Sequence, residues 1–298
     1  MTSPENERKA ESGKRKEGGT FRFPLSAFRS QTLLVYACLV AGAALTILPL
    51  WWMVAASFMP TGEANSFPPR LWPSRVTSEH YAALFARLNL ARYAGNSVLV
   101  AVATTAISIA LNSMAGYAFA KLQFVGRDRI FRLLVAALVI PGQVGMLPLF
   151  LLLRQLGLVN TYWGVIIPGM ASIYGIFMVR QYAMSIPDTL LDAARIDGAS
   201  ELRIFWEIVL PSLRPILVTL GLFTFMGAWN DFLWPLVVLT DGDLYTLPVA
   251  LANLIGEHVQ DTELMMAGAV LTVLPVIIVF VALQRFYIAG VLSGSLKE

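Results

Sequence analysis

Long stretches without a charged residue alternate along this chain with short, strongly polar segments. A membrane-spanning helix needs about 20 predominantly apolar residues, because each residue adds about 1.5 Å along the helix axis. Six stretches meet this requirement: residues 33–56, 93–120, 133–153, 155–179, 211–240 and 264–284. The fifth stretch contains only Arg214 near its start and Asp231 further along. The pattern therefore predicts an all-α integral membrane protein with six transmembrane helices.

Composition argues against a soluble protein with buried helices. The 298 residues are 57% hydrophobic and only 14% charged, whereas ordinary globular domains carry about 25% charged residues. Covering six uncharged helices with a polar surface would need a far longer chain. Lipid is therefore the predicted solvent of most of this surface.

The distribution of basic residues predicts the orientation in the membrane. Residues 1–32 contain seven Lys or Arg, and the loop after the second stretch contains Lys121, Arg127, Arg129 and Arg132. Residues 241–263 contain five acids and neither Lys nor Arg. Cytoplasmic loops are the basic ones, so we expect both termini to be cytoplasmic in the inner membrane of a bacterium or archaeon, although the first external loop, which also carries Arg, is an exception.

Three regions follow from this arrangement. Residues 1–32 form a basic tail that is too polar to order itself, and residues 33–92 hold the first transmembrane helix and an extracytoplasmic loop. A short interfacial helix is expected at 78–88. Residues 93–298 hold the other five transmembrane helices, a cytoplasmic loop at 185–211 and a cytoplasmic C-terminal tail.

Helix-breaking residues interrupt the third stretch, where Pro141, Gly142, Gly145 and Pro148 follow one another closely. Inside a membrane such residues are tolerated where neighbouring helices or water satisfy the freed backbone groups. Two interpretations stay open at this stage: a span packed beside a cavity, and a simple kink that faces lipid.

The loop at 185–211 has the signals of two short helices that meet at a corner. Pro187 and Asp188 suit a first helical turn, and Gly198 suits the left-handed position after a helix. Ser200 can cap a second helix. The apolar positions Leu202, Phe205, Ile208 and Val209 are expected on one face of that helix.

Acidic residues outnumber basic ones in this helix pair. Asp188, Asp192, Asp197, Glu201 and Glu207 accompany only Arg195 and Arg203. Helices that lie on lipid are usually rich in Lys and Arg, and acidic ones are repelled by anionic headgroups. A groove on a protein partner is therefore the favoured binding site for this segment.

The same loop resembles the EAA loop of ABC-importer permeases. The residues that carry the resemblance are Asp192-Ala193-Ala194, Asp197-Gly198-Ala199, Phe205, Ile208, Leu210-Pro211 and Pro215, with Asp192 in place of the usual Glu. Three further segments are similar to the carbohydrate branch, specifically the maltose-type partner permease: Gly116 to Ala120, Ala228 to Phe232, and Gln284-Arg285-Phe286 with Gly290 and Gly294. The resemblance extends from the second span to the end of the chain.

The resemblance implies a type I importer permease fold and a function without enzymatic activity of its own. It implies a subunit that forms half of the pathway for a mono- or oligosaccharide or a polyol. A second permease, a pair of ATPase subunits that bind ATP and Mg, and an extracytoplasmic solute-binding protein are the implied partners; no cofactor is expected on this chain, and nucleic acid is not an expected partner. The implied contacts with the ATPase are Asp192, Ala193, Ala194, Asp197, Gly198, Ala199, Glu201 and Phe205, with the tail residues Ser293, Gly294 and Ser295.

Four polar or aromatic residues within the spans are candidates for the substrate pathway: Trp229, Asn230, Asp231 and Asn112. A carboxylate at mid-membrane is costly and is therefore a functional candidate. Asp231 lies about 20 residues beyond Pro211, however, so a position near the outer interface and a capping role are equally compatible with the sequence. Asn112 has a similar alternative as a polar contact between helices.

Several other functions lack their sequence signals. A phosphate-binding GxxxxGK[ST] loop is absent, so ATP has to be bound by another chain. The two histidines, His80 and His258, are far apart and do not suggest a zinc site. A membrane hydrolase would lack a base beside its serine. An ion-coupled carrier or channel remains the alternative function, although the spans contain no pairs of buried charges.

Overall fold

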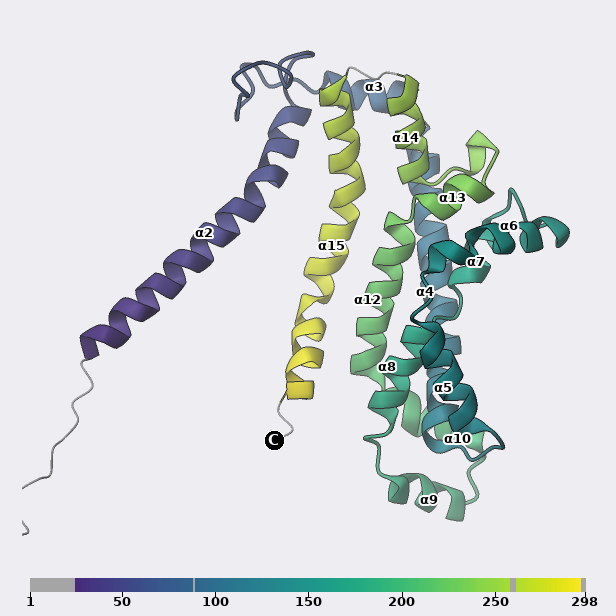
Figure 1. Ribbon diagram of the computed structural model, residues 1–298. Coiled ribbons are helices and arrows are strands. Elements are labelled where there is room, and N and C mark those ends of the chain that lie inside the picture. Colours follow the sequence, from purple (N-terminus) through teal and green to yellow (C-terminus); the bar gives the residue numbers. More distant parts are fainter. Residues whose placement is uncertain (1–24, 88, 258–260, 296–298) are drawn as a thin grey trace, which may run out of the picture. The chain divides into compact units, whose positions relative to one another are not determined.

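The computed structural model describes residues 25–87, 89–257 and 261–295, and the described residues are helical with connecting loops (Figure 1). Three helices are long and apolar enough to cross a membrane. They are α2 (Leu25–Ser57), α4 (Leu90–Lys121) and α15 (Thr262–Ser295). They correspond to the first, second and sixth predicted spans.

Three further spans are bent pairs of helices. The first pair joins α5 (Arg127–Ala137) to η1 (Gly142–Gly145) and α6 (Met146–Gln155) with a bend of 97°. The second joins α7 (Tyr162–Gly169) to α8 (Ile173–Ala183) with a bend of 41°. The third joins α10 (Glu201–Ile204), η2 (Phe205–Val209) and α11 (Leu210–Ser212) to α12 (Arg214–Asn230) with a bend of 78°. Counting each pair as one span gives the six that the sequence predicts.

Two predicted spans differ in outline from the observed helices. The third is not one helix, because α5 ends at Ala137 and the chain turns at Pro141, which is extended and has no N–H to continue a helix. The fifth ends at Asn230, and α13 (Leu233–Val238) is a separate short helix. Asp231 therefore lies in the link between two helices and not inside a span.

The N-terminal helix begins earlier than predicted. α2 starts at Leu25, so part of the tail expected to be disordered is helical, while residues 1–24 lie outside the described part of the chain. The described residues up to Trp52 form one compact unit, and those from Met53 onward form another. Within the first unit, the side chains of α2 from Thr32 to Trp51 are exposed, as expected of a helix that packs on lipid or on another chain.

The second unit is built around α4, which packs along α8 and α12, while α12 also packs on α15. Gly116 of α4 permits the close approach to α8, because a Cβ there would lie 2.5 Å from Val179 Cγ1. The short helix expected at 78–88 is observed as α3 (Glu79–Arg87). The remaining elements are α9 (Asp188–Ile196), η3 (Gly242–Leu244) and α14 (Leu247–Glu257).

Buried apolar side chains join these helices in clusters. One cluster contains Tyr117, Val179, Leu191, Ile204, Phe205 and Val209 among its members, and we call it the elbow core. It connects the short helices α9 and α10 to the long helices α4, α8 and α12. Close-packed side chains therefore connect α9 to three spans.

Candidate functional site

The first candidate site is the elbow, residues 188–209, which lies at the lower end of the second unit in Figure 1. α9 follows Pro187 and ends where Gly198 has a φ of +84°. The amide of Ala199 donates to the carbonyl of Ala194 across this corner, at 3.0 Å. Ser200 caps α10 by accepting from the amide of Arg203. These boundaries agree with those predicted from the sequence.

The inward face of the second helix differs from the prediction. Ile204, Phe205 and Val209 are buried, whereas Leu202 is 64% exposed. Residues 205–209 form a π turn, in which each turn takes up an additional residue compared with an α-helix. The π turn changes which residues of the helix face the core. A regular period of 3.6 residues therefore wrongly places Leu202 on the same face as Phe205 and Val209.

Arg195 closes the elbow with ion pairs to both of its arms. It donates to Asp192 of α9 at 2.7 Å and to Glu201 of α10 at 2.8 Å. Glu201 in turn accepts a hydrogen bond from the Tyr117 hydroxyl of α4 at 2.8 Å. The hydrogen bonds to Glu201 and Asp192 raise the pKa of Arg195 above its ordinary value. The angle between the two short helices is thus fixed by side chains that also touch a transmembrane helix.

A second clamp holds the start of α9. Lys121, at the end of α4, has a side chain that is only 6% exposed, and it donates to the Ile186 carbonyl and to Asp188, each at 2.6 Å. The hydrogen bond and the charge of Lys121 lower the pKa of Asp188. On α10 and the π turn, Arg203 pairs with Glu207 at 3.0 Å.

Because of these ion pairs, most of the acidic residues of the elbow are already neutralised by cations of this chain. The sequence suggested acids that are available to basic groups of a partner, but four of the five have a cation of this chain beside them. Among the described residues, only Asp197 of the five makes no such pair. Asp192, Ala193, Asp197 and Gly198 are exposed together with Ile196, whose exposed fraction is 87%. The outer surface of the elbow therefore combines small and apolar residues with acids that are mostly paired within this chain, which favours close packing against a protein.

Three members of the predicted contact set face inward. Phe205 is 4% exposed within the elbow core, and Ala194 and Ala199 pack against that core. These three side chains stabilise the elbow by packing on its buried side.

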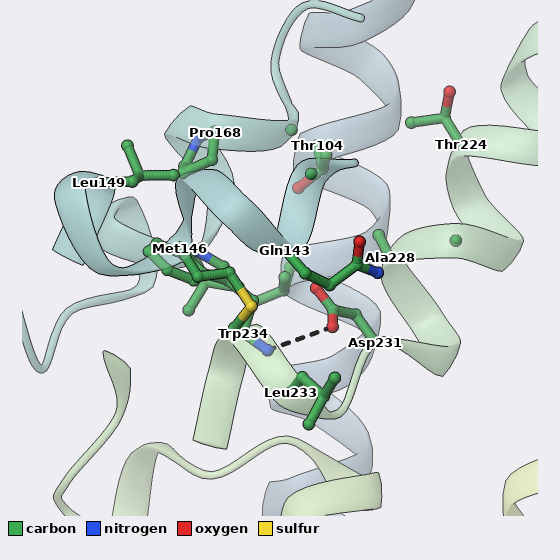
Figure 2. Close-up of a pocket in the computed structure, with 15 residues that line it drawn as sticks. Thr104, Gln143, Met146, Leu149, Pro168, Thr224, Ala228, Asp231, Leu233 and Trp234 are labelled. Carbon is green, nitrogen blue, oxygen red and sulfur yellow. Dashed lines mark hydrogen bonds between the residues drawn. The ribbon is translucent and has the colours of Figure 1, made fainter. Parts of the chain in front are cut away.

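The second candidate site is a pocket of about 430 Å³ between α4, α6, α7, α12 and α13. Figure 2 shows Asp231 and Gln143 beside one another at this pocket, with Thr104 and Thr224 on other helices. Apolar residues such as Met146, Leu149 and Trp234 form most of the remaining wall. Few polar groups on an apolar wall are typical of sites that bind small molecules.

Local hydrogen bonds fix the geometry around Asp231. Its carboxylate accepts from the backbone amide of Trp234 at 3.3 Å (Figure 2), so it caps the turn that opens α13. The Trp234 indole donates to the Gly164 carbonyl of α7 at 3.1 Å. The capping alternative of the sequence is thus observed, and among the described residues the other carboxylate oxygen of Asp231 has no hydrogen-bond donor.

The other pathway candidates do not line this pocket. Trp229 is 2% exposed and donates to the Thr272 carbonyl of α15 at 3.0 Å. Asn230 is exposed and donates to the Met226 carbonyl of its own helix. Asn112 is fully buried, and it donates to Ser108 and accepts from the amide of Ser172, the residue that precedes α8. The contacts of Trp229 and of Asn112 with Ser172 therefore join helices to one another, whereas that of Asn230 lies within α12.

Gln143 was not found from the sequence. The signal for it was the cluster of helix breakers around Pro141 and Gly142, which predicts irregular backbone beside a cavity as one of two interpretations. The observed bend turns residues 142–146 toward α12, and Gly142, Gln143 and Met146 line the pocket.

The candidate tail contacts lie at the end of α15. Its backbone is described as helical up to Ser295, whereas the side chains of Ser293 and Ser295, with Gly294 between them, lie outside the described part of the structure.

Replacing Asn112 by Ala is expected to destabilise the protein by about 1–3 kcal/mol, because the partly buried amide of Ser172 loses its acceptor. The measurement is the thermal unfolding of the purified protein in detergent. Asn230→Ala is the matched control, because it removes an exposed hydrogen bond within one helix. Equal unfolding temperatures for the two variants would contradict the role of Asn112 as a buried contact between α4 and α8.

Known proteins provide an independent comparison. The family model described as "Binding-protein-dependent transport system inner membrane component" matches residues 112–292. The chain is 39% identical to the arabinooligosaccharides transport system permease protein AraQ of Halalkalibacterium halodurans, over 86% of this chain and 92% of that protein. It is 32% identical to the lactose transport system permease protein LacG of Rhizobium radiobacter, over 90% of this chain and 97% of that protein.

Solved structures support the same architecture. A chain of a bacterial ABC transporter involved in the import of the acidic polysaccharide alginate superposes with a TM-score of 0.78 at 23% identity, and the match covers 89% of this chain and 99% of that chain. At this level of identity the likeness concerns the fold.

Proposed function

Because this chain belongs to the family of binding-protein-dependent transport system inner membrane components, we propose that its elbow is the contact for the ATPase subunits. The chain is a permease subunit of an ATP-binding-cassette sugar importer in the membrane. The observation that supports the proposed contact is Arg195, which holds α9 and α10 at a fixed angle beneath α4. A rigid, exposed elbow can transmit a push to the spans, whereas a flexible loop would absorb it.

Importers of this family pair a permease with a second permease, ATPase subunits and a solute-binding protein. In our proposal the ATPase dimer binds ATP and Mg, and this chain binds neither. Ile196 and the exposed Ala193 enter a cleft of the ATPase, and Gly198 allows the close approach at the corner. The elbow then faces the cytoplasm, and both termini are on the same side.

The pocket at Asp231 is proposed as this chain's share of the sugar pathway. Its polar side chains Thr104, Gln143 and Thr224 come from three different spans, and Asp231 directly follows α12, so relative movement of the spans changes their spacing. The free oxygen of Asp231 and the amide of Gln143 can exchange hydrogen bonds with sugar hydroxyls. Relatives named for arabinooligosaccharide and lactose transport support a saccharide as the substrate class.

Gly198→Val tests the elbow. A left-handed conformation costs an L-residue about 1–2 kcal/mol, and a β-branched side chain is especially unfavourable there. We expect about tenfold less ATPase subunit to co-purify with this variant, with normal insertion of the chain in the membrane. Gly198→Asn is expected to be milder, because Asn tolerates this backbone region.

Gly157→Val is the matched control, since Gly157 also has a positive φ of 69° but lies after α6, away from the elbow. An equal loss of ATPase in both variants would show that general strain, and not the elbow, is responsible. If the wild-type chain alone moved sugar across vesicle membranes without ATP, the proposed function would be wrong and the protein would be a self-sufficient carrier.

A further inference from the structure

A groove of about 890 Å³ runs along α12 and shares no lining residue with the pocket at Asp231. Thr105 and Ile109 of α4 form one wall, and Val279 of α15 lies on the other. Leu217 and Leu222 of α12 are buried residues that also line it. Nearly all of its lining is apolar, so the groove suits hydrocarbon and not a sugar.

The end of the groove nearest the elbow is chemically different. Arg214, the first residue of α12, lines it there together with Trp206 of the π turn. Arg214 is exposed, and within the described part of the chain its guanidinium has no acidic partner. Trp206 is 58% exposed. An arginine and a tryptophan beside an apolar surface are typical of the boundary between hydrocarbon and lipid headgroups.

The length of the groove matches one leaflet of a bilayer. From Arg214 to Phe225, which line its two ends on α12, eleven residues rise by about 16 Å. The hydrocarbon core of a bilayer is about 30 Å thick, so this is about half of it. A lipid whose headgroup lies at Arg214 would therefore place an acyl chain along the groove as far as the middle of the membrane.

We propose that this groove binds an anionic phospholipid of the cytoplasmic leaflet, with its phosphate on the Arg214 guanidinium and one acyl chain along α12. The choice of leaflet rests on the proposed function, because the elbow marks the cytoplasmic side. Basic sites between transmembrane helices on that side bind anionic headgroups. The guanidinium offers two parallel donors to a phosphate, which strengthens the interaction beyond simple attraction.

Charge also favours a lipid over an apolar helix of a second permease. A helix packed along the whole groove would cover Arg214 and leave a cation in an apolar contact without a partner, which is costly. A phospholipid matches both ends of the groove, because its acyl chain suits the apolar end at Phe225 and its negatively charged headgroup suits Arg214. The two halves of the site therefore match one class of ligand.

The test uses the importer complex, purified with its co-expressed partner subunits and stripped of lipid in detergent. Phosphatidylglycerol and phosphatidylcholine with identical acyl chains are added back separately, and native mass spectrometry counts the bound molecules. We expect phosphatidylglycerol to be preferred by the wild type. Arg214→Gln should lower its occupancy about fivefold, and Arg214→Lys should retain most of it because the charge remains.

Arg132→Gln is the matched control, because Arg132 of α5 is also an exposed basic residue but does not line the groove. An equal loss of phosphatidylglycerol in the Arg132 and Arg214 variants, or unchanged binding in Arg214→Gln, would overturn the proposal. Cross-linking of a cysteine at Val218, in a Cys38→Ser background, to a span of the second permease would overturn it as well. The same spectra report whether ATPase subunits are retained, so failure of the lipid site and failure of the proposed function are separate results.

Discussion

Reversing the charge of Arg195 is expected to reduce ATPase retention and ATP-driven transport about thirtyfold, while the chain still inserts in the membrane. Arg195→Glu removes the two ion pairs with Asp192 and Glu201 and places a third carboxylate between them. The Arg195 side chain is 35% exposed, so the two pairs together are worth about 1 kcal/mol, and the new repulsion adds a similar amount. Together these changes amount to about 2 kcal/mol, which corresponds to about thirtyfold.

Two further variants test whether the loss comes from the ion pairs of Arg195 or from the added negative charge. Combining Arg195→Glu with Glu201→Arg restores one opposite pair across the corner and is expected to recover part of the transport, measured as ATP-dependent sugar uptake into vesicles. Arg203→Glu breaks the pair with Glu207, which lies on one arm of the elbow with both side chains more than 60% exposed. Its effect should stay below about threefold. If it were as damaging as Arg195→Glu, negative charge alone would explain the loss.

The elbow shows which features local sequence can predict. Pro187, Gly198 and Ser200 act on the backbone within a few residues, so the boundaries of both short helices followed from their positions. The hydrogen bond from Tyr117 to Glu201 spans 84 residues of sequence. Nothing local to either residue indicates it, because it depends on how α4 and α10 pack.

In the transmembrane spans, too, some features follow from the local sequence and others depend on how the helices pack. Uncharged stretches predict where the chain enters the membrane, because the bilayer imposes its thickness on every span. Pro141 and Gly142 predict helix-breaking positions in the third span, but the 97° bend and its direction depend on the helices it meets. Gln143 reaches the pocket only because of that direction. The most specific parts of the candidate pathway are therefore those that the sequence indicates least.

Gly116→Val is expected to leave less than about a tenth of the normal amount of assembled importer. A Cβ at position 116 would lie 2.5 Å from Val179 Cγ1 and 3.0 Å from the backbone nitrogen of Arg180. The side chain of Val179 can adopt another rotamer, but the backbone of α8 cannot move without separating α8 from α4. Overpacking of this kind costs up to about 3 kcal/mol, and more where backbone must shift. The measurement is the yield of intact complex in size-exclusion chromatography after detergent extraction.

The same helix provides the control. Gly95 also lies in α4, but a Cβ there would meet nothing within 4 Å, so Gly95→Val should yield a normal amount of complex. The smaller change Gly116→Ala should be partly rescued by Val179→Gly, which removes the nearest clashing atoms and leaves only the tight approach to Arg180. Normal yield from Gly116→Val would contradict the described contact between α4 and α8. Because Tyr117 and Val179 both belong to the elbow core, any separation there would also loosen the connection through which we propose that ATPase movements reach the spans.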